Sequence, residues 1–375
     1  MNNTAPSPCF VLDEQKLENN LSLIKRVADQ AQVEIILAFK GFAMWSAFPI
    51  VRKYITGATA SSVHEMMLCN EHMKTKSHTY AVAYKDDDID QILEGSSHIT
   101  FNSLSQLERF GEKANDLGVS VGLRVNPEYS DVETDLYNPS SPTSRLGVKS
   151  ENIINDLPDY VEGLHFHVLC ESNSYALEKT LASFEDKFGH LLPNIKWLNM
   201  GGGHLMTRKD YDTGHLIQVL KAFKAKHKLH LILEPGSAFA WETGTLKTTV
   251  IDLVENGGVK TAIIDGSFTC HMPDCLEMPY RPKLANGYPE VDKGQYKYRL
   301  GGVSCLAGDF LEAYSFDKPL NVGDEIEFLD MIHYTMVKTS TFNGVQHPAI
   351  GLKKKNGDFE LIRTFDYSDY KKRLS

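Results

Sequence analysis

Short apolar runs alternate with helical patterns from about residue 13 to residue 240, and this alternation is the feature that most constrains the fold. Strands that alternate with helices form a parallel sheet joined by helical crossovers. Counted from residue 34, about eight strand–helix units fit into roughly 200 residues, close to the usual length of a (β/α)8 barrel. A doubly wound open sheet is the alternative, and the number of units slightly favours the barrel.

The predicted barrel strands are short apolar runs bounded by polar residues or glycine. They cover residues 34–40, 58–61, 79–82, 98–101, 119–125, 161–168, 196–199 and 229–234. Helical patterns lie between them over residues 63–69, 103–117, 176–192 and 211–226. The stretch 126–149, rich in Pro, Ser and Asn, is too long for a simple connection and is predicted to be a functional loop.

Beyond residue 241 the pattern changes to strands without helices between them. The strand patterns cover residues 245–254, 259–264, 296–300, 325–329 and 359–363, separated by glycine-containing turns. We therefore predict two domains. Residues 13–240 form a barrel, and residues 1–12 with 241–375 form an all-β, sandwich-like or barrel-like domain.

Charge and cysteine content narrow the class of protein. The formal net charge is −10, with 49 acidic against 39 basic residues, which argues against nucleic-acid binding and is compatible with a cationic substrate. The 6 cysteines include no C-x-x-C pair and are interpreted as reduced thiols rather than disulfides or zinc ligands. The N-terminus has no secretory pattern, and no apolar stretch approaches the ~20 residues that span a bilayer. These features predict a cytoplasmic protein.

Lys40 ends the apolar run 34–40 and is followed at once by Gly41. Side chains alternate across a strand, so Lys40 shares a face with Ile36 and Ala38 at the C-terminal end of a buried strand. Desolvation there lowers the pKa of an ammonium group and leaves an amine free to form an imine with an aldehyde. Taken alone, the segment favours a lysine whose stem packs on apolar surface while its head reaches water.

Three further features reverse that preference. In Gly163-Leu164-His165-Phe166-His167 both histidines fall on one face of the strand. A metal ion would need a third ligand, and none is found at a convincing spacing. His167 is therefore interpreted as stacking on a planar cofactor. The run Gly201-Gly202-Gly203 follows a strand and precedes a helix, where backbone N–H groups bind phosphate. Glu234 ends the run 229–234, and a buried acid there needs a cationic partner such as a protonated pyridine nitrogen.

Lysine, imidazole, glycine run and glutamate together describe a site for pyridoxal 5′-phosphate (PLP) at the top of a barrel, with no metal. Glu234 also favours decarboxylation over racemisation, because an acid on the ring nitrogen keeps the cofactor a strong electron sink. A non-catalytic regulatory homologue is a weaker alternative, since such a protein would be expected to lack Lys40 or Cys305.

The sequence resembles the fold-type III, alanine-racemase-like PLP decarboxylases, which include ornithine and diaminopimelate decarboxylases. The resemblance spans nearly the whole chain and rests on Ala38-Phe39-Lys40, Phe166-His167-Val168, Gly201-Gly202-Gly203, Glu234-Pro235-Gly236, Gly266-Ser267-Phe268, Tyr334-Thr335 and Phe342-Asn343-Gly344. The variants His167-Val168-Leu169-Cys170-Glu171 and the run from Gly301 to Asp309 are most similar to the branch that decarboxylates carboxynorspermidine and carboxyspermidine in polyamine biosynthesis.

The resemblance implies a role for each matching barrel residue. Lys40 would carry PLP as an imine and His167 would stack on its ring. Gly202 and Gly203 would contact the phosphate, and Glu234 would face the pyridine nitrogen.

In the second domain, the resemblance makes Tyr334 a phosphate ligand and Asp274 the partner of the substrate's distal amine. Cys305 would face the cofactor of the neighbouring subunit and donate a proton, which implies a homodimer with shared active sites. Three departures stand out. The usual His-Val-Gly-Ser becomes His167-Val168-Leu169-Cys170, which reshapes the loop beside the ring. Ser237 replaces an arginine that binds phosphate in many relatives. Leu306 replaces the acid of ornithine-type enzymes. An ornithine- or diaminopimelate-type activity is the alternative, and no motif decides between the carboxylated triamines.

Overall fold

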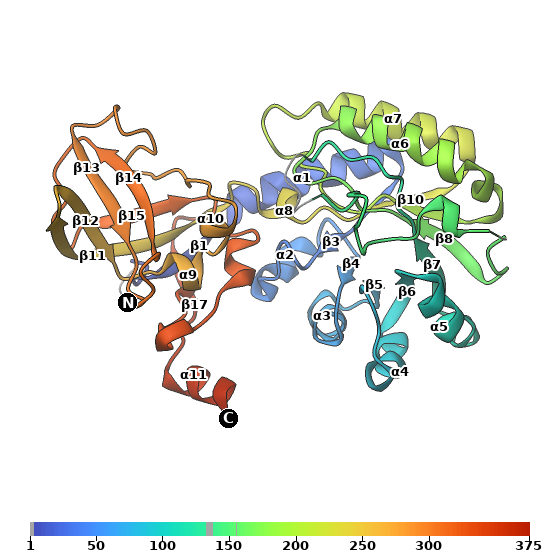
Figure 1. The fold of residues 1–375 in the computed structure, drawn as a ribbon, viewed down its shortest axis with the longest axis horizontal. Coiled ribbons are helices and arrows are strands. Elements are labelled where there is room, and N and C mark those ends of the chain that lie inside the picture. The colour runs from blue at the N-terminus through green and yellow to red at the C-terminus, as the bar shows by residue number, and fades with distance from the viewer. Residues whose placement is uncertain (1–3, 133–137, 155) are drawn as a thin grey trace. The chain divides into compact units, whose positions relative to one another are not determined.

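The computed structural model describes residues 4–132, 138–154 and 156–375. The chain forms two compact units, one over Asn20–Phe239 and the other over Met1–Asn19 together with Ala240–Ser375. The first, called here the barrel unit, consists of strands surrounded by helices, and the second, the β unit, is mostly strands (Figure 1).

The sheet of the barrel unit consists of β2 (Glu34–Ile35), β3 (Leu37–Ala38), β4 (Ala58–Ala60), β5 (Ser77–Tyr80), β6 (Ser96–Phe101), β7 (Ser120–Arg124), β8 (Val161–His165), β9 (Trp197–Asn199) and β10 (His230–Leu233). These strands pair in parallel in the order β2-β10-β9-β8-β7-β6-β5-β4-β3. β2 and β3 are parts of one segment, because Ile36 between them donates to the Leu233 carbonyl at 2.9 Å. The sheet therefore closes, and the predicted (β/α)8 barrel with a second, all-β part is confirmed.

The helices of this part of the chain are α1 (Glu14–Ala31), α2 (Phe48–Val51), α3 (Val63–Leu68), α4 (Asp86–Gly95), α5 (Leu104–Asp116), α6 (Ser174–Phe188), α7 (Thr213–His227) and α8 (Ser237–Ala240). Polar side chains start several of them. Ser62, Ser103, Asn173 and Asp212 each accept a backbone N–H of the first turn of α3, α5, α6 and α7.

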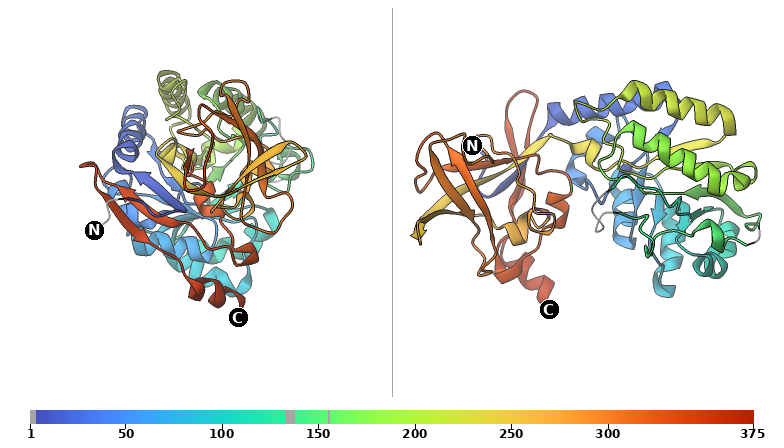
Figure 2. Two further views of the ribbon diagram at one scale, coloured as in Figure 1. Left: turned by 90° about the vertical axis from the view of Figure 1, so that its left-hand side faces the viewer. Right: turned by 45° about the horizontal axis from the view of Figure 1, so that its top comes forward.

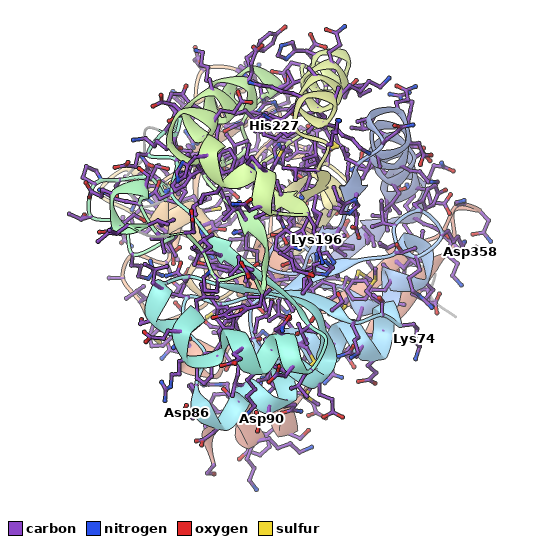
Figure 3. The ribbon with its side chains drawn as sticks, turned by 90° about the vertical axis from the view of Figure 1, so that its right-hand side faces the viewer. Lys74, Asp86, Asp90, Lys196, His227 and Asp358 are labelled. Atoms are coloured by element: carbon purple, nitrogen blue, oxygen red, sulfur yellow. The ribbon has the colours of Figure 1, made fainter. Side chains whose placement is uncertain are left out.

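Ion pairs join neighbouring helices on the outside of the barrel. Arg109 and Lys113 on α5 pair with Asp86 and Asp90 on α4. His227 at the end of α7 contacts Glu185 on α6. Asp86, Asp90 and His227 are seen at this periphery in Figure 3, and α6 and α7 run side by side in Figure 1 and in the right-hand view of Figure 2.

Trp197 fills the interior of the barrel. Its indole packs with Ile36 and Ile232 in the core, and it fits only because two neighbouring strands have glycine there. A Cβ on Gly163 would lie 2.0 Å from the indole, and one on Gly122 would lie 2.3 Å from it. The large and small residues of adjacent strands are therefore complementary, as expected for a barrel whose interior is packed rather than open.

The predicted strand 34–40 is shorter than expected, and the placement of Lys40 within a strand is wrong. β3 ends at Ala38, whose carbonyl accepts the amides of Gly41 at 3.0 Å and Phe42 at 3.3 Å. Lys40 thus lies in a turn immediately after the strand. Gly41 makes this turn possible, since a Cβ there would lie 2.6 Å from the Cα of Gly236.

The β unit consists of β1 (Cys9–Asp13), β11 (Gly244–Asn256), β12 (Val259–Ile264), β13 (Tyr296–Gly301), β14 (Phe310–Phe316), β15 (Glu325–Leu329), β16 (Ala349–Lys353) and β17 (Phe359–Arg363), with short helices α9 (Phe268–His271), α10 (Asp274–Glu277) and α11 (Tyr367–Leu374). The strands follow the order β14-β13-β12-β11-β1-β16-β17, and β15 also pairs with β11. The N-terminal strand β1 lies between β11 and β16. Among the described residues, no helix has the length and apolar character needed to cross a membrane.

Buried and half-buried histidines make the fold sensitive to acid. His78 on β5 and His98 on β6 stack with 3.9 Å between ring centroids, and burial followed by the charge of His78 lowers the pKa of His98 to about 3. Burial also lowers the pKa of His204 to about 4. Such a ring stays neutral in the folded protein, whereas in the unfolded chain it takes up a proton below pH about 6.5. Each ring should therefore remove up to about 1.4 kcal/mol of stability per pH unit as the pH falls below 6.5.

We expect the midpoint of urea unfolding to be clearly lower at pH 5 than at pH 7. His98→Gln should weaken this pH dependence, because one proton-binding ring is gone from the unfolded chain. His190→Gln, which removes an exposed ring, is the matched control. An unchanged pH dependence in His98→Gln would show that His98 is not responsible.

Candidate active site

The hydrogen bonds around Lys40 favour an uncharged amine. Its Nζ lies 3.1 Å from Nε2 of His167, while Nδ1 of His167 accepts the amide of Gly202 at 2.7 Å. A neutral ring with this partner carries its proton on Nε2 and donates it to the lysine nitrogen. The pKa of Lys40 is lowered, first by desolvation and then by the charge of Arg124, although the side chain stays accessible to solvent.

Glu234 remains a carboxylate although it is buried. Its Oε1 accepts the side-chain amide of Asn199 at 2.7 Å, and Nε2 of His165 lies 3.5 Å from its Oε2. Burial acts to raise the pKa of Glu234, but the interactions with His165 and Asn199 outweigh it and hold the pKa below its ordinary value. An ionised acid is therefore present, ready for a cationic partner such as a protonated ring nitrogen.

The glycine run after β9 lies close to two other site segments. Gly201 and Gly203 have φ values of +66° and +87°. A Cβ on Gly202 would lie 2.5 Å from the carbonyl oxygen of Glu234, and one on Gly203 would lie 2.2 Å from that of Leu169. Only glycines allow this approach. The run thus forms a backbone cradle between the end of β10 and the loop that carries His167.

Arg124 is a site residue that the sequence analysis missed. It ends β7, is only 3% exposed, and donates through Nη2 to the backbone carbonyl of His167 at 2.9 Å. Its guanidinium lies over the ring of Tyr80, 4.7 Å from the centroid. Among the described residues, no carboxylate forms an ion pair with it. A charged residue at the end of an apolar strand is the signal that identified Lys40 and Glu234, and it could have identified Arg124.

Tyr334, in the β unit, has a strained backbone. Its φ and ψ are 47° and −59°, and the amide of Thr335 donates to the His333 carbonyl at 2.5 Å. These values describe a γ-turn that is rare for a residue with a side chain. Such strain is typical of functional positions, where the surrounding structure holds the residue in place.

Cys305 lies in a loop held together by Asp309. The thiol is free and exposed, and the Cys305 amide donates to the side chain of Asn343 at 2.9 Å. Asp309 is buried and accepts hydrogen bonds from Ser267, at 2.9 Å, and from the amides of Thr269 and Ser304. The separate motifs around residues 267, 305 and 343 are thereby brought together within the β unit.

Asp274 is the first residue of α10. Its carboxylate pairs with the ammonium of Lys338, which also contacts Glu277 at 2.8 Å. The sequence analysis did not identify Lys338 or Glu277. The predicted residues therefore form one group in the barrel unit, around Lys40, and a second in the β unit, around Tyr334, Cys305 and Asp274.

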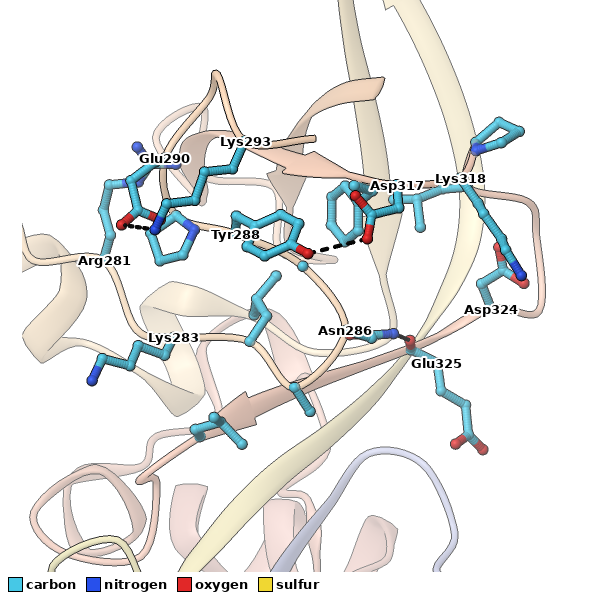
Figure 4. Close-up of a pocket in the computed structure, with 18 residues that line it drawn as sticks. Arg281, Lys283, Asn286, Tyr288, Glu290, Lys293, Asp317, Lys318, Asp324 and Glu325 are labelled. Carbon is cyan, nitrogen blue, oxygen red and sulfur yellow. Dashed lines mark hydrogen bonds and ion pairs between the residues drawn. The ribbon is translucent and has the colours of Figure 1, made fainter. Parts of the chain in front are cut away.

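A cavity of about 910 Å³ in the β unit contains none of the predicted site residues (Figure 4). Its charged and polar side chains largely satisfy one another: Lys293 pairs with Glu290 at 2.8 Å, and Tyr288 donates to Asp317 at 3.1 Å. No group of His, Cys, Asp or Glu side chains in the described part of the chain is arranged to hold a metal ion.

Comparison with known proteins defines the class of this chain. The family described as "Pyridoxal-dependent decarboxylase, C-terminal sheet domain" matches residues 9–332. The chain belongs to the pyridoxal-dependent decarboxylases; it is a carboxy-lyase, and its cofactor is PLP. The lysine amine, the ionised glutamate and the glycine cradle fit that cofactor. The family and the enzyme class predicted from the sequence are confirmed.

Individual relatives cover nearly the full chain. The carboxyaminopropylagmatine decarboxylase of Synechocystis sp. is 53% identical, over 98% of this chain and 95% of the relative. The carboxynorspermidine/carboxyspermidine decarboxylase of Campylobacter jejuni is 41% identical, over 98% of each. The crystal structure of carboxynorspermidine decarboxylase from the same organism, a complex with norspermidine, has a TM-score of 0.91 at 40% identity, over 98% of this chain and 99% of that one. The branch indicated by the sequence motifs is thus less similar than the Synechocystis relative.

Proposed function

We propose that the protein decarboxylates an α-amino acid whose side chain is a polyamine with a terminal cation. The observation that carries this proposal is the contact between the Lys40 amine and His167, beside the buried Glu234 whose pKa is held below its ordinary value, at the C-terminal end of a barrel. The two relatives at 53% and 41% identity are both named as decarboxylases of carboxylated polyamines, which supports this substrate class.

PLP supplies an electron sink for the electron pair left when CO₂ departs. In the proposal, Lys40 holds the cofactor and His167 packs on its ring. The turn of Gly202 and Gly203 receives the phosphate, and Glu234 faces the pyridine nitrogen and keeps it protonated.

The β unit completes the site in this proposal. Tyr334 binds the phosphate, Cys305 returns a proton to the substrate carbon, and Asp274 binds the terminal cation. Cys305 serves the barrel unit of a second copy, so the enzyme is a homodimer with shared sites. The two domains then correspond to residues 13–240 and to residues 1–12 with 241–375.

Carboxyaminopropylagmatine, whose tail ends in a guanidinium, is the first candidate substrate because of the 53% identity. Carboxynorspermidine and carboxyspermidine, whose tails end in an ammonium, are the second candidates, favoured by the 41% identical relative. Asp274 and Glu277 offer two carboxylates to either cation, and a planar guanidinium engages two carboxylate oxygens at once. Ornithine is disfavoured, because Leu306 gives its short amine no acid partner.

Steady-state kinetics on these carboxylated polyamines, with ornithine and diaminopimelate for comparison, test the proposal. We expect kcat/KM to be highest for carboxyaminopropylagmatine and lower for ornithine by several orders of magnitude. Asp274→Asn should reduce kcat/KM for the long substrates by roughly 10- to 150-fold, the value of a charge-assisted pair, without changing PLP absorbance. A higher rate on carboxynorspermidine would select the second candidate. Comparable rates on ornithine would contradict the substrate class.

A further inference from the structure

Lys338 lies between two acids of the β unit. Its Nζ contacts Oδ1 of Asp274 and, at 2.8 Å, Oε2 of Glu277. The acids belong to α10, whereas Lys338 ends the 3₁₀ turn Thr335–Lys338, which follows Tyr334 directly. The side chains of Asp274 and Lys338 are 17% and 35% exposed, so the group is partly shielded from solvent.

The charges in this group do not cancel. Burial acts to lower the pKa of Lys338, but the hydrogen bonds to Asp274 and Glu277 raise it above its ordinary value, so the ammonium stays charged. Two carboxylates with one ammonium leave a net charge of −1. Among the described residues, these three form no ion pair with any other side chain. Lys338 also uses only one oxygen of each carboxylate, which leaves acceptors for a second cation.

We propose that Lys338 is a specificity-determining residue, whose ammonium reduces the charge of the Asp274–Glu277 pair from −2 to −1 and thereby adapts it to one terminal cation of the substrate. This inference rests on the proposed function. The substrate's cation binds beside Lys338 and shares the two acids with it. Without Lys338 the acids would attract any cationic tail more strongly and discriminate less between tails of different charge.

A charge series in the holoenzyme separates this role from a purely structural one. The group has a net charge of −1 in the wild type, −2 in Lys338→Met, 0 in Glu277→Gln and −1 again in the double variant. We expect the KM for the long substrate to fall about tenfold in Lys338→Met and to rise about tenfold in Glu277→Gln, as for a unit charge a few ångströms from the ligand. The double variant should return to within about threefold of the wild type.

Two control variants accompany the series. Lys338→Arg keeps the charge and should keep the KM, while Lys283→Met removes an exposed lysine of the same unit and should have no effect. The amino acid 2,4-diaminobutyrate, whose short side chain ends in an ammonium but lacks the distal cation of the long substrates, should show the same KM with all variants, since it is too short to reach the acids.

Calorimetric titration of the same proteins with norspermidine provides a readout independent of turnover, and its affinity should follow the same order. The inference is overturned if Lys338→Met binds norspermidine more weakly than the wild type, or if the double variant binds it more weakly than both single variants. The ion pairs would then only hold α10 and the turn Thr335–Lys338 together. If the wild type decarboxylates neither long substrate, the proposed function is rejected instead. The norspermidine titration would still test whether Lys338 controls the affinity for a cation.

Discussion

Lys40→Ala is expected to reduce turnover by more than about 10⁴-fold, because Lys40 is the amine proposed to fix the cofactor aldehyde in place. The lysine nitrogen accepts a hydrogen bond from His167 at 3.1 Å, and an alanine in this turn leaves His167 without that partner. The loss should therefore appear in kcat at saturating PLP.

Mass spectrometry after borohydride reduction gives a second measurement. The wild type should retain PLP covalently on the peptide that contains Lys40, and the alanine variant should retain none. Lys221→Ala, which removes an exposed lysine from α7, should behave as the wild type. Substantial activity of Lys40→Ala without an added amine would mean that another residue carries the cofactor.

The same variant tests the shared sites of the proposed homodimer. Mixing inactive Lys40→Ala with inactive Cys305→Ala chains gives mixed dimers in half of the population, each with one intact site. Up to about a quarter of wild-type activity should return, since each such dimer has one of two sites. If subunits exchange and no activity returns, each chain forms its site alone.

Glu234→Gln is expected to lower kcat by roughly 30- to 1000-fold. The amide keeps the shape of the side chain but removes the negative charge, and losing one partner of a buried charged pair costs about 2–4 kcal/mol. Asn199 can still donate to the amide oxygen of glutamine, so the fold should be unaffected. Covalent attachment of PLP through Lys40 should also persist, which distinguishes this variant from Lys40→Ala.

Glu234→Asp serves as the conservative comparison, because it keeps the charge and should recover part of the activity. Glu112→Gln, an exposed acid on α5, is the matched control for the substitution itself. A Glu234→Gln enzyme with wild-type kcat would show that the reaction does not depend on a protonated ring nitrogen.

The barrel could be predicted because its signal is local. Each strand is a short apolar run, and most predicted bounds differ from the observed ones by one to three residues. Helix α4 was missed because of its acidic sequence, although its three first-turn aspartates favour a helix N-terminus. Strand β16 was missed for another reason: it has only five residues, contains Gly351, and forms by parallel pairing with β1, at the opposite end of the chain.

The same distinction applies to the site. Lys40, His167 and Glu234 were found because each ends or follows an apolar strand, and parallel strands bring their carboxyl ends together. Lys338 was missed because its partner Asp274 is 64 positions away, and no local sequence pattern indicates such a pair. The turn at Lys40 was misplaced because it depends on the close approach of Gly41 to Gly236, which is visible only in three dimensions.

Asn199 links two segments of the proposed cofactor site through its side chain. Its side-chain nitrogen donates to Glu234 at 2.7 Å, and its oxygen accepts the amide of Gly201 at 2.9 Å. A single amide group therefore sets the spacing between the acid and the glycine run. In the proposed site, the distance that the bound cofactor must match is therefore set when the chain folds, and little ordering entropy is lost when the cofactor binds. Because one side chain bonds to both segments, a displacement of Glu234 would also disturb the turn at Gly201.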